Sequence, residues 1–499
     1  MCTPQPPVYN ASINNRPGRA TTTGTVASVP DFPAAPQGIS TMVDGPKTSS
    51  RRKISWQEIA QHNTYANAWV VIHHKVYDIS KWDGHPGGMV MLSQAGEDAT
   101  DIFTVCHPTS SWKLLEQFCI GDVDESTAPG LNDLSDEQKA KKARTDEFIS
   151  AYRRLRIKIK GMGLYDASMV YYAWKILSTF GLWMASVAIC YHFESWPMYM
   201  LAACVMGLFW QQSGWLAHDV LHHQVWENHM IGNVMGVIIG DIWMGFSVQW
   251  WKNKHNFHHA VPNLIGDAKT KYLGDPDIDT MPLLAWSKHM ASKAYESSWG
   301  PFFISHQAVI YFPLLLFARF SWLLQSYYYV FKGFAFGKYD PVDLPNGEKF
   351  GLLVHYLWNV LLPVVTGMSI AQGLAFFMIS QMSCGAFLAV VFSVGHNGMS
   401  VYEREDKPDF WKLQVTTTRN ITPGFFMDWF CGGLNYQIEH HLFPMMPRHN
   451  LQKVNPLVKS LCKEYDVRFH ETGFYRGLVE VVDELAEISK EFLLEFPAM

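Results

Sequence analysis

Charged residues are scarce in this chain of 499 residues: they make up 17%, against about 25% in soluble globular domains. The eight cysteines are scattered and form no CxxC pair, which excludes a cysteine zinc site and a disulfide framework. The net charge is -5, and no basic cluster has interleaved aromatic residues, which argues against a nucleic-acid partner. The few charges collect at the ends and in a few loops, so a fully soluble or mostly disordered protein is excluded.

Long apolar runs fill the middle of the chain, and hydrophobic residues reach 48% overall. Four runs are each long enough to cross about 30 Å of hydrocarbon. They form two closely connected pairs, 170–192 with 196–217 and 351–370 with 372–395. The sequence therefore predicts two transmembrane hairpins with four spans.

Two further apolar runs contain ionisable residues. The run 231–248 carries Asp241, and the run 303–330 carries His306 and Arg319. Because such side chains are costly in hydrocarbon, we expect these two helices to lie in the membrane interface. With four spans, the segments that remain outside all lie on one side of the membrane: 1–169, 218–350 and 396–499.

The other segments define the domain organisation. Residues 1–50 are rich in Pro, Ser and Thr and contain no apolar signal-peptide stretch, which predicts a disordered leader. Residues 51–125 form a polar α+β segment with strands expected at 69–72 and 75–79. The expected remainder is a linker and polar helix at 126–165, a membrane domain at 166–448 and a cytosolic helical tail at 449–499.

A His-Pro-Gly-Gly motif begins at His85 in the polar segment, and His107 follows it. A haem iron between two imidazoles needs histidines from separate elements, and the glycines let the backbone approach the porphyrin. With KVYDI before the motif and AGEDATDIF after it, the region 53–124 resembles cytochrome b5. The resemblance implies haem b with His85 and His107 as axial ligands, and one-electron transfer.

Acidic residues gather near the expected haem edge, at Asp83, Glu97, Asp98 and Asp101. Such a surface suits docking to a basic reductase. Acidic loops are also commonly nothing more than solvated surface, so both interpretations stay open here.

Three histidine clusters lie just outside the apolar runs. The clusters are His218, His222 and His223; His255, His258 and His259; and Gln437, His440 and His441. On a helix, residues at i, i+3 and i+4 share a face, so each cluster can aim two or three side chains at one point. His396, at the exit of the last apolar run, is a further candidate ligand. The spacing predicts a metal site rather than packing.

The number of histidines indicates two metal ions, because the clusters hold eight imidazoles and one zinc takes at most four ligands. Imidazole ligands alone admit zinc, copper, nickel or iron. A haem electron carrier in the same chain requires a redox metal, which favours two non-haem iron ions. We expect His229, His289, His355, His449 and His470 to be structural.

The region 53–499 resembles the front-end fatty acyl desaturases, in which a cytochrome b5 domain is fused to a membrane desaturase whose third histidine box begins with Gln. The boxes match at HDxxH from His218, HxxHH from His255 and QxxHH from Gln437, and the flanking runs are most similar to algal and diatom delta-6 enzymes. The implied fold is a small α+β haem domain fused to an all-α polytopic membrane domain, with interfacial helices and a cytosolic helical cap.

The resemblance also implies the reaction and its partners. O₂ is the co-substrate, and electrons come from NADH through cytochrome b5 reductase and the haem. The substrate is an acyl lipid or acyl-CoA, and the expected location is the endoplasmic reticulum membrane, with the haem domain and histidine boxes facing the cytosol. Delta-5, delta-8 and sphingolipid delta-8 desaturation, lipid hydroxylation and a non-enzymatic haem carrier remain as alternatives.

Overall fold

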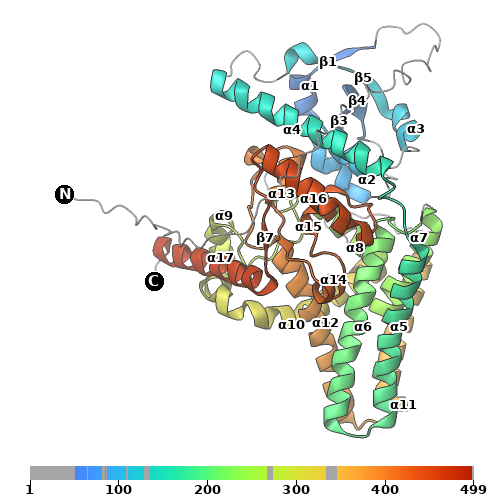
Figure 1. Cartoon of the computed structure of the whole chain (residues 1–499). Helices are drawn as coiled ribbons and strands as arrows, with labels where there is room; N and C mark the ends of the chain where they lie inside the picture. The colour runs from blue at the N-terminus through green and yellow to red at the C-terminus, as the bar shows by residue number, and fades with distance from the viewer. Residues whose placement is uncertain are drawn as a thin grey trace, which may run out of the picture. The chain divides into compact units, whose positions relative to one another are not determined.

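The computed structural model describes residues 51–496 except 65, 81, 83, 84, 86, 108–110, 129–134, 227, 267–272 and 333–344. The predictions for residues 1–50 and for Asp83 lie outside the described residues. From Arg51 onward the chain forms one unit, which begins with an α+β domain and continues into helices (Figure 1).

The N-terminal domain is built on a five-stranded sheet in the order β1-β5-β4-β3-β2. β1 and β5 are parallel, and the other neighbouring strands are antiparallel. Val70, Ile72 and Tyr77 belong to its core, as expected for β-branched and aromatic residues on a pleated surface. The predicted strands are confirmed as β3 and β4. The strands are β1 (Lys53–Ser55), β2 (Asn63–Thr64), β3 (Asn67–Ile72), β4 (Lys75–Asp78) and β5 (Cys119–Asp124).

Short helices complete the domain. The Ser55 hydroxyl accepts a hydrogen bond from the Glu58 amide at 3.2 Å and so caps the first of them. They are α1 (Trp56–Gln61), η1 (Gly88–Gln94), α2 (Thr100–Cys106), α3 (Ser111–Leu115), η2 (Glu116–Phe118) and η3 (Glu125–Thr127). The elements η1 and α2 matter most for function, because η1 follows His85 and α2 ends at His107.

The polar helix after the linker is α4 (Asp136–Gly161), in agreement with the range predicted from the sequence. Ser135 and Gln138 form a reciprocal capping box at its start. Although the helix is mostly polar, Phe148, Tyr152 and Ile159 are buried in a core with residues of the C-terminal region. α4 is therefore part of the folded structure rather than a free spacer.

The four predicted spans are all helical. α5 (Met169–His192) and α6 (Trp196–Leu221) lie side by side, and α11 (Pro345–Val365) and α12 (Ile370–His396) follow one another (Figure 1). Large apolar side chains of α5 and α11 are exposed, among them Trp174, Leu177 and Val364. An exposed apolar surface of this kind is expected where a helix faces lipid.

By length and composition, three described helices could cross a membrane: α5, α12 and α10 (Gly300–Lys332), the last over residues 300–331. Two of the predicted spans, α6 and α11, are not among them, and α6 carries polar residues such as Gln211 and Gln212, which are buried in the protein. α10, expected in the interface, runs at a steep angle to α5 and α6 in Figure 1. The two-hairpin topology stays a prediction.

The predicted interfacial run 231–248 forms a bent element. α7 (His229–Gly236) continues into the π-helix η4 (Val237–Met244), and the chain then turns by 103° into α8 (Val248–Ala260). Gly245 lies at the bend with φ of 81°, a conformation that glycine adopts without strain. The bend directs α8, which carries the second histidine cluster, away from α7.

The remaining elements are α9 (Lys288–Ser292), η5 (Lys293–Glu296), η6 (Arg404–Asp406), α13 (Phe410–Thr416), β6 (Asn420–Ile421), α14 (Phe425–Phe430), α15 (Gln437–Leu442), α16 (Arg448–Glu464), β7 (Glu471–Thr472) and α17 (Phe474–Glu495). The amphipathic helices α16 and α17 contribute buried residues such as Val454, Val458 and Leu485 to two separate cores. The first core also contains residues of α4, and the second contains residues of α10.

Candidate haem site and metal centre

His85 and His107 face each other in the N-terminal domain, with ring centroids 5.9 Å apart. Nδ1 of His107 donates to the Phe103 carbonyl at 3.0 Å, which leaves Nε2 for a metal. Burial lowers the pKa of His85 to about 4, helped by His107, so the ring is neutral and able to bind iron. A Cβ on Gly87 would lie 2.9 Å from the His85 ring, so glycine is required there. The site fits a bis-histidine haem.

Four helices bring the other histidine clusters together. α6 ends at the first cluster, α8 carries the second, α15 carries the third, and His396 is the last residue of α12. The clustered side chains are buried, although imidazoles are polar and the surrounding helices are rich in apolar residues. Buried polar groups need partners, so their convergence calls for an explanation.

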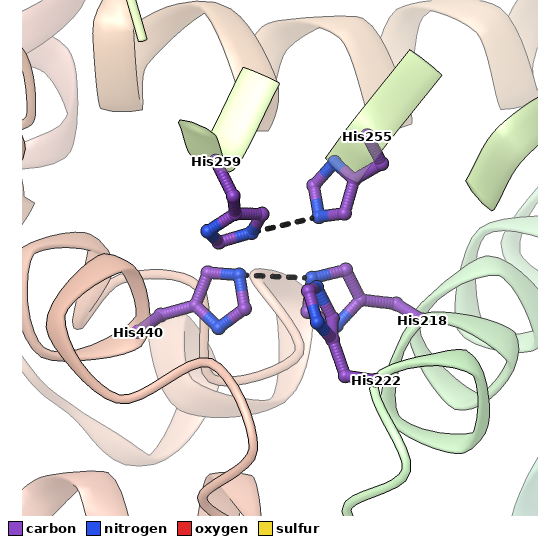
Figure 2. A group of neighbouring side chains, drawn as sticks. All are labelled: His218, His222, His255, His259 and His440. Carbon is purple, nitrogen blue, oxygen red and sulfur yellow. Dashed lines mark hydrogen bonds between the residues drawn. The ribbon is translucent and has the colours of Figure 1, made fainter. Parts of the chain in front are cut away.

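Five imidazoles form the first group, in which one nitrogen of each lies within 4.8 Å of all the others: His218, His222, His255, His259 and His440. Figure 2 shows the rings meeting from opposite sides. Nε2 of His218 lies 3.1 Å from Nε2 of His440, and the same atoms of His259 and His255 are 3.1 Å apart. These ring nitrogens converge on one another, and among the described residues no hydrogen-bond acceptor lies between them. Converging imidazole nitrogens of this kind are the ligands that a metal ion needs.

Three imidazoles form the second group: His258, His396 and His441. Nε2 of His258 lies 3.2 Å from Nε2 of both other residues. The Gln437 side-chain amide is 2.7 Å from Nε2 of His396, so it lies against this group. The structure therefore brings His396 and Gln437 into the site, as the sequence predicts, although their role as ligands stays a prediction.

The two groups adjoin each other. The rings of His259 in the first group and His441 in the second are stacked with centroids 4.3 Å apart. Burial, with neighbouring histidines adding to it, lowers the pKa of His440 and His441 well below the usual value. Neutral imidazole is the form that coordinates metal, so the donor set fits two neighbouring ions.

His223 is a predicted ligand that the structure places outside both groups. Its backbone has φ of 56°, in the left-handed region, and its ring stacks on His229 with centroids 4.0 Å apart. The reason is local, because α6 ends at Leu221 with His222 as its cap, and the left-handed backbone of His223 directs that side chain elsewhere. The histidines expected to be structural are also outside both groups: His229, His289, His355, His449 and His470.

Residues far from the boxes hold the outer nitrogens of the second group. Asp275 accepts from Nδ1 of His258 at 2.9 Å, and Oε1 of Gln414 lies 2.8 Å from Nδ1 of His441. Such contacts fix the tautomer and orientation of a ligand imidazole. Sequence reasoning missed both residues, and the only signal was that Asp275 lies in a run that resembles the family.

Two acids lie inside the boxes, Asp219 beside His218 and Glu439 beside His440, and only Asp219 contacts a box imidazole. Asp219 lies 3.4 Å from Nδ1 of His218 and also contacts Arg448 at 2.5 Å. Glu439 instead accepts from Asn420 at 2.8 Å and Asn455 at 3.0 Å, and burial raises its pKa to about 7. Glu439 therefore anchors α15 and does not orient an imidazole.

Replacing Asp275 with asparagine is expected to weaken metal binding about 10- to 100-fold, because the second group loses the charge that orients His258. Asn263 N–H donates to Oδ2 of Asp275 and Asp277 N–H to Oδ1, so the single oxygen of asparagine keeps one of these two hydrogen bonds. Metal content measured after graded chelation checks this. Asp279→Asn, an exposed change in the same loop, is the control. Equal retention in both variants would contradict the role of Asp275.

A cavity of about 440 Å³ lies against both groups. His218, His258 and His396 line it, together with apolar side chains such as Phe246 and Leu388. Lys254, Asp277 and Asp279 form a polar part of its wall. An apolar cavity with a few polar groups is the usual form of a small-molecule site.

Comparison with known proteins gives two matches along the chain. Residues 194–473 match the family described as fatty acid desaturase, and residues 55–124 match the cytochrome b5-like heme/steroid binding domain. The acyl-lipid (9-3)-desaturase of Physcomitrium patens is 37% identical over 455 residues, which cover 89% of this chain and 81% of the relative.

The chain belongs to the fatty acid desaturase family. It is therefore an oxidoreductase with a fused cytochrome b5-like domain, which confirms the resemblance proposed from its sequence. Other relatives of this desaturase carry names that give different delta positions. The delta(8)-fatty-acid desaturase of Euglena gracilis is 31% identical, covering 83% of this chain and 94% of the relative, and the delta(6)-fatty-acid desaturase fat-3 of Caenorhabditis elegans is 32% identical, covering 81% and 92%.

Proposed function

We propose that the protein is a front-end, delta-6 acyl desaturase. It inserts a cis double bond between an existing double bond and the carboxyl end of a polyunsaturated acyl chain, for example converting linoleic to gamma-linolenic acid. The observation that carries this proposal is that both imidazole groups adjoin one apolar cavity. The relatives named for fatty acid desaturation support the substrate class. The delta-6 position rests on the resemblance of the flanking sequence runs to delta-6 enzymes, since the relatives are named for several positions.

The chemistry requires more than side chains. An unactivated methylene has no acidic proton, so an acid or base cannot remove its hydrogen. Two non-haem irons bound by the two groups would supply the activation of O₂ that this step needs. The chain's own part is to keep imidazoles such as those of His440 and His441 neutral, to fix ligands through Asp219, Asp275 and Gln414, and to hold the acyl chain in the cavity beside them.

The electron supply is proposed to run from NADH through cytochrome b5 reductase to the haem between His85 and His107, and then to the metal centre. Each double bond takes two electrons and one O₂ and yields water. The apolar helices fit a membrane protein, and we propose the endoplasmic reticulum with the sites facing the cytosol. The chain contains a glycosylation sequon, Asn420-Ile421-Thr422. It does not test this orientation, because Asn420 is buried and its side chain donates a hydrogen bond to Glu439.

The test is the position of the new double bond. Yeast that expresses the chain is fed linoleic, alpha-linolenic and twenty-carbon polyunsaturated acids, and mass spectrometry locates each new bond. A bond at carbon six, absent with a His440→Ala chain, is the expected result. Bonds only at carbon five or eight would overturn delta-6 and keep the desaturase, while a product only in sphingoid bases would replace the substrate class.

A further inference from the structure

Two carboxylates of the haem domain form ion pairs with cations from outside that domain. Asp101 of α2 accepts two hydrogen bonds from Arg153 of α4, at 2.8 and 2.9 Å. Glu97 contacts Lys407 and lies 3.3 Å from Arg404. Both carboxylates belong to the acidic surface that the sequence suggests for docking a reductase. Asp98, in contrast, accepts from the Thr100 amide at the start of α2.

An apolar contact lies beside these ion pairs. Val90 of η1 and Ile102 of α2 pack against Phe257, Val261 and Leu264, at and just after the end of α8. η1 follows the axial ligand His85, and α8 carries the second histidine cluster. The contact therefore joins the element beside the haem to the element that holds the metal ligands.

α4 makes a second connection of the same kind. On one side, Arg153 holds Asp101, in the helix that ends at His107. On the other, the Tyr152 hydroxyl donates to the Leu442 carbonyl at 3.1 Å, at the end of the helix that carries His440 and His441. Packed residues therefore connect His85 to the second histidine cluster, and other packed residues connect His107 to the third cluster.

We propose that Glu97 and Asp101 form an electrostatic docking face that seats the haem domain on α4 and on residues 404–407 of the same chain, beside the apolar contact with α8, and that the domain leaves this face to be reduced. The proposal rests on the electron route proposed above. In the docked state one electron leaves the haem, so that its iron goes from Fe(II) to Fe(III) and the metal centre gains that electron. Two such transfers serve each double bond, and NADH supplies both electrons through the reductase.

Reversible docking follows from the charges. A carboxylate paired with Lys407 or Arg153 cannot at the same time pair with a basic residue of a reductase, so the two contacts exclude each other. The ion pairs of the docking face are also partly exposed: the side chains of Glu97, Asp101 and Arg153 are 30%, 16% and 47% accessible. Interfaces between domains of one chain generally resemble transient ones, so relative motion of the domains is expected.

The test uses full-length, haem-loaded protein with charge reversals on the desaturase side, Arg153→Asp and Lys407→Glu. Hydrogen–deuterium exchange of residues 88–102 and 257–264 is expected to rise in both variants, because repulsion opens the contact. Lys490→Glu, an exposed reversal on α17, is the control and should leave exchange unchanged. Adding Asp101→Arg to Arg153→Asp restores opposite charges and should return exchange toward the original level.

The rates of haem reoxidation and of haem reduction distinguish an effect on docking from an effect on reduction by the reductase. Reoxidation of the pre-reduced haem with O₂ and substrate is expected to slow on the order of tenfold in the reversals, as charge pairs control association. Reduction of the haem by NADH and reductase should stay equal or become faster, because the carboxylates are released. Slower reduction in Lys407→Glu would overturn the mutual exclusion.

The outcomes distinguish this proposal from the proposed function. If the unaltered chain makes no new double bond, the proposed function fails. If it desaturates, and both reversals match Lys490→Glu in exchange and reoxidation, the docking face is wrong. Should Arg153→Asp alter the haem spectrum, Lys407→Glu decides, because it lies outside the haem domain and in no described core.

Discussion

Replacing His440 with alanine is expected to abolish desaturation, with a loss of more than about a hundredfold, because a ligand change must exceed the 10- to 100-fold effect of an outer contact. His440 is fully buried and its Nε2 faces Nε2 of His218 at 3.1 Å. Its loss leaves the first group of imidazoles incomplete. Non-haem iron, expected at two ions per haem in the unaltered chain, should fall while the haem spectrum is unchanged.

The control for this substitution comes from the same sequence motifs. His223 belongs to the first box, but its ring stacks on His229 outside both groups. His223→Ala is therefore expected to keep its iron and most of its activity. Metal analysis and product yield of the His440→Ala and His223→Ala variants test whether each residue is a metal ligand. A fully active His440→Ala chain, or an iron-free His223→Ala chain, would overturn the assignment of these two residues.

Removing an axial ligand is expected to remove the haem. In His85→Ala the iron keeps only His107, so the bis-histidine absorption spectrum should be lost, while iron at the metal centre stays. NADH-driven desaturation by purified protein and reductase should then stop, because the haem is the only electron entry in that mixture. The measurement combines a reduced-minus-oxidised spectrum with product analysis.

His74→Ala is the matched control for the haem ligand. His74 lies in the same domain, but its side chain is 81% exposed and pairs with Glu125 at the surface. Its spectrum and activity should equal those of the unaltered chain. An unchanged spectrum in His85→Ala would exclude it as an axial ligand, whereas continued desaturation without haem would exclude the proposed electron route.

Much of the site is encoded in local sequence spacing. A helix places residues at i, i+3 and i+4 on one face wherever it packs, so the boxes at His255 and His440 already indicate converging imidazoles. The haem motif is similarly local, because the loop after His85 and the end of the helix before His107 carry their own turn and helix signals. The same holds for α4 and α5, whose limits follow from capping residues and hydropathy.

Other features depend on packing between distant segments and could not be predicted from spacing. His223 is five residues after His218, so helical spacing alone leaves its role open, and the turn after α6 sets its ring against His229. Asp275 and Gln414 reach the second group from loops and helices that only the fold brings near. No pattern in a single sequence records which side chain meets another across such separations.

The sequence by itself determined the kind of chemistry to expect, because helical spacing predicts an imidazole-rich centre and the resemblance to cytochrome b5 predicts a haem. The tertiary structure decided how those ligands divide. It formed one group of five imidazoles and one of three, placed both beside an apolar cavity, and paired Glu97 and Asp101 with cations of the same chain. The physical reason is that these relations are set by the packing of helices whose contacts span hundreds of residues.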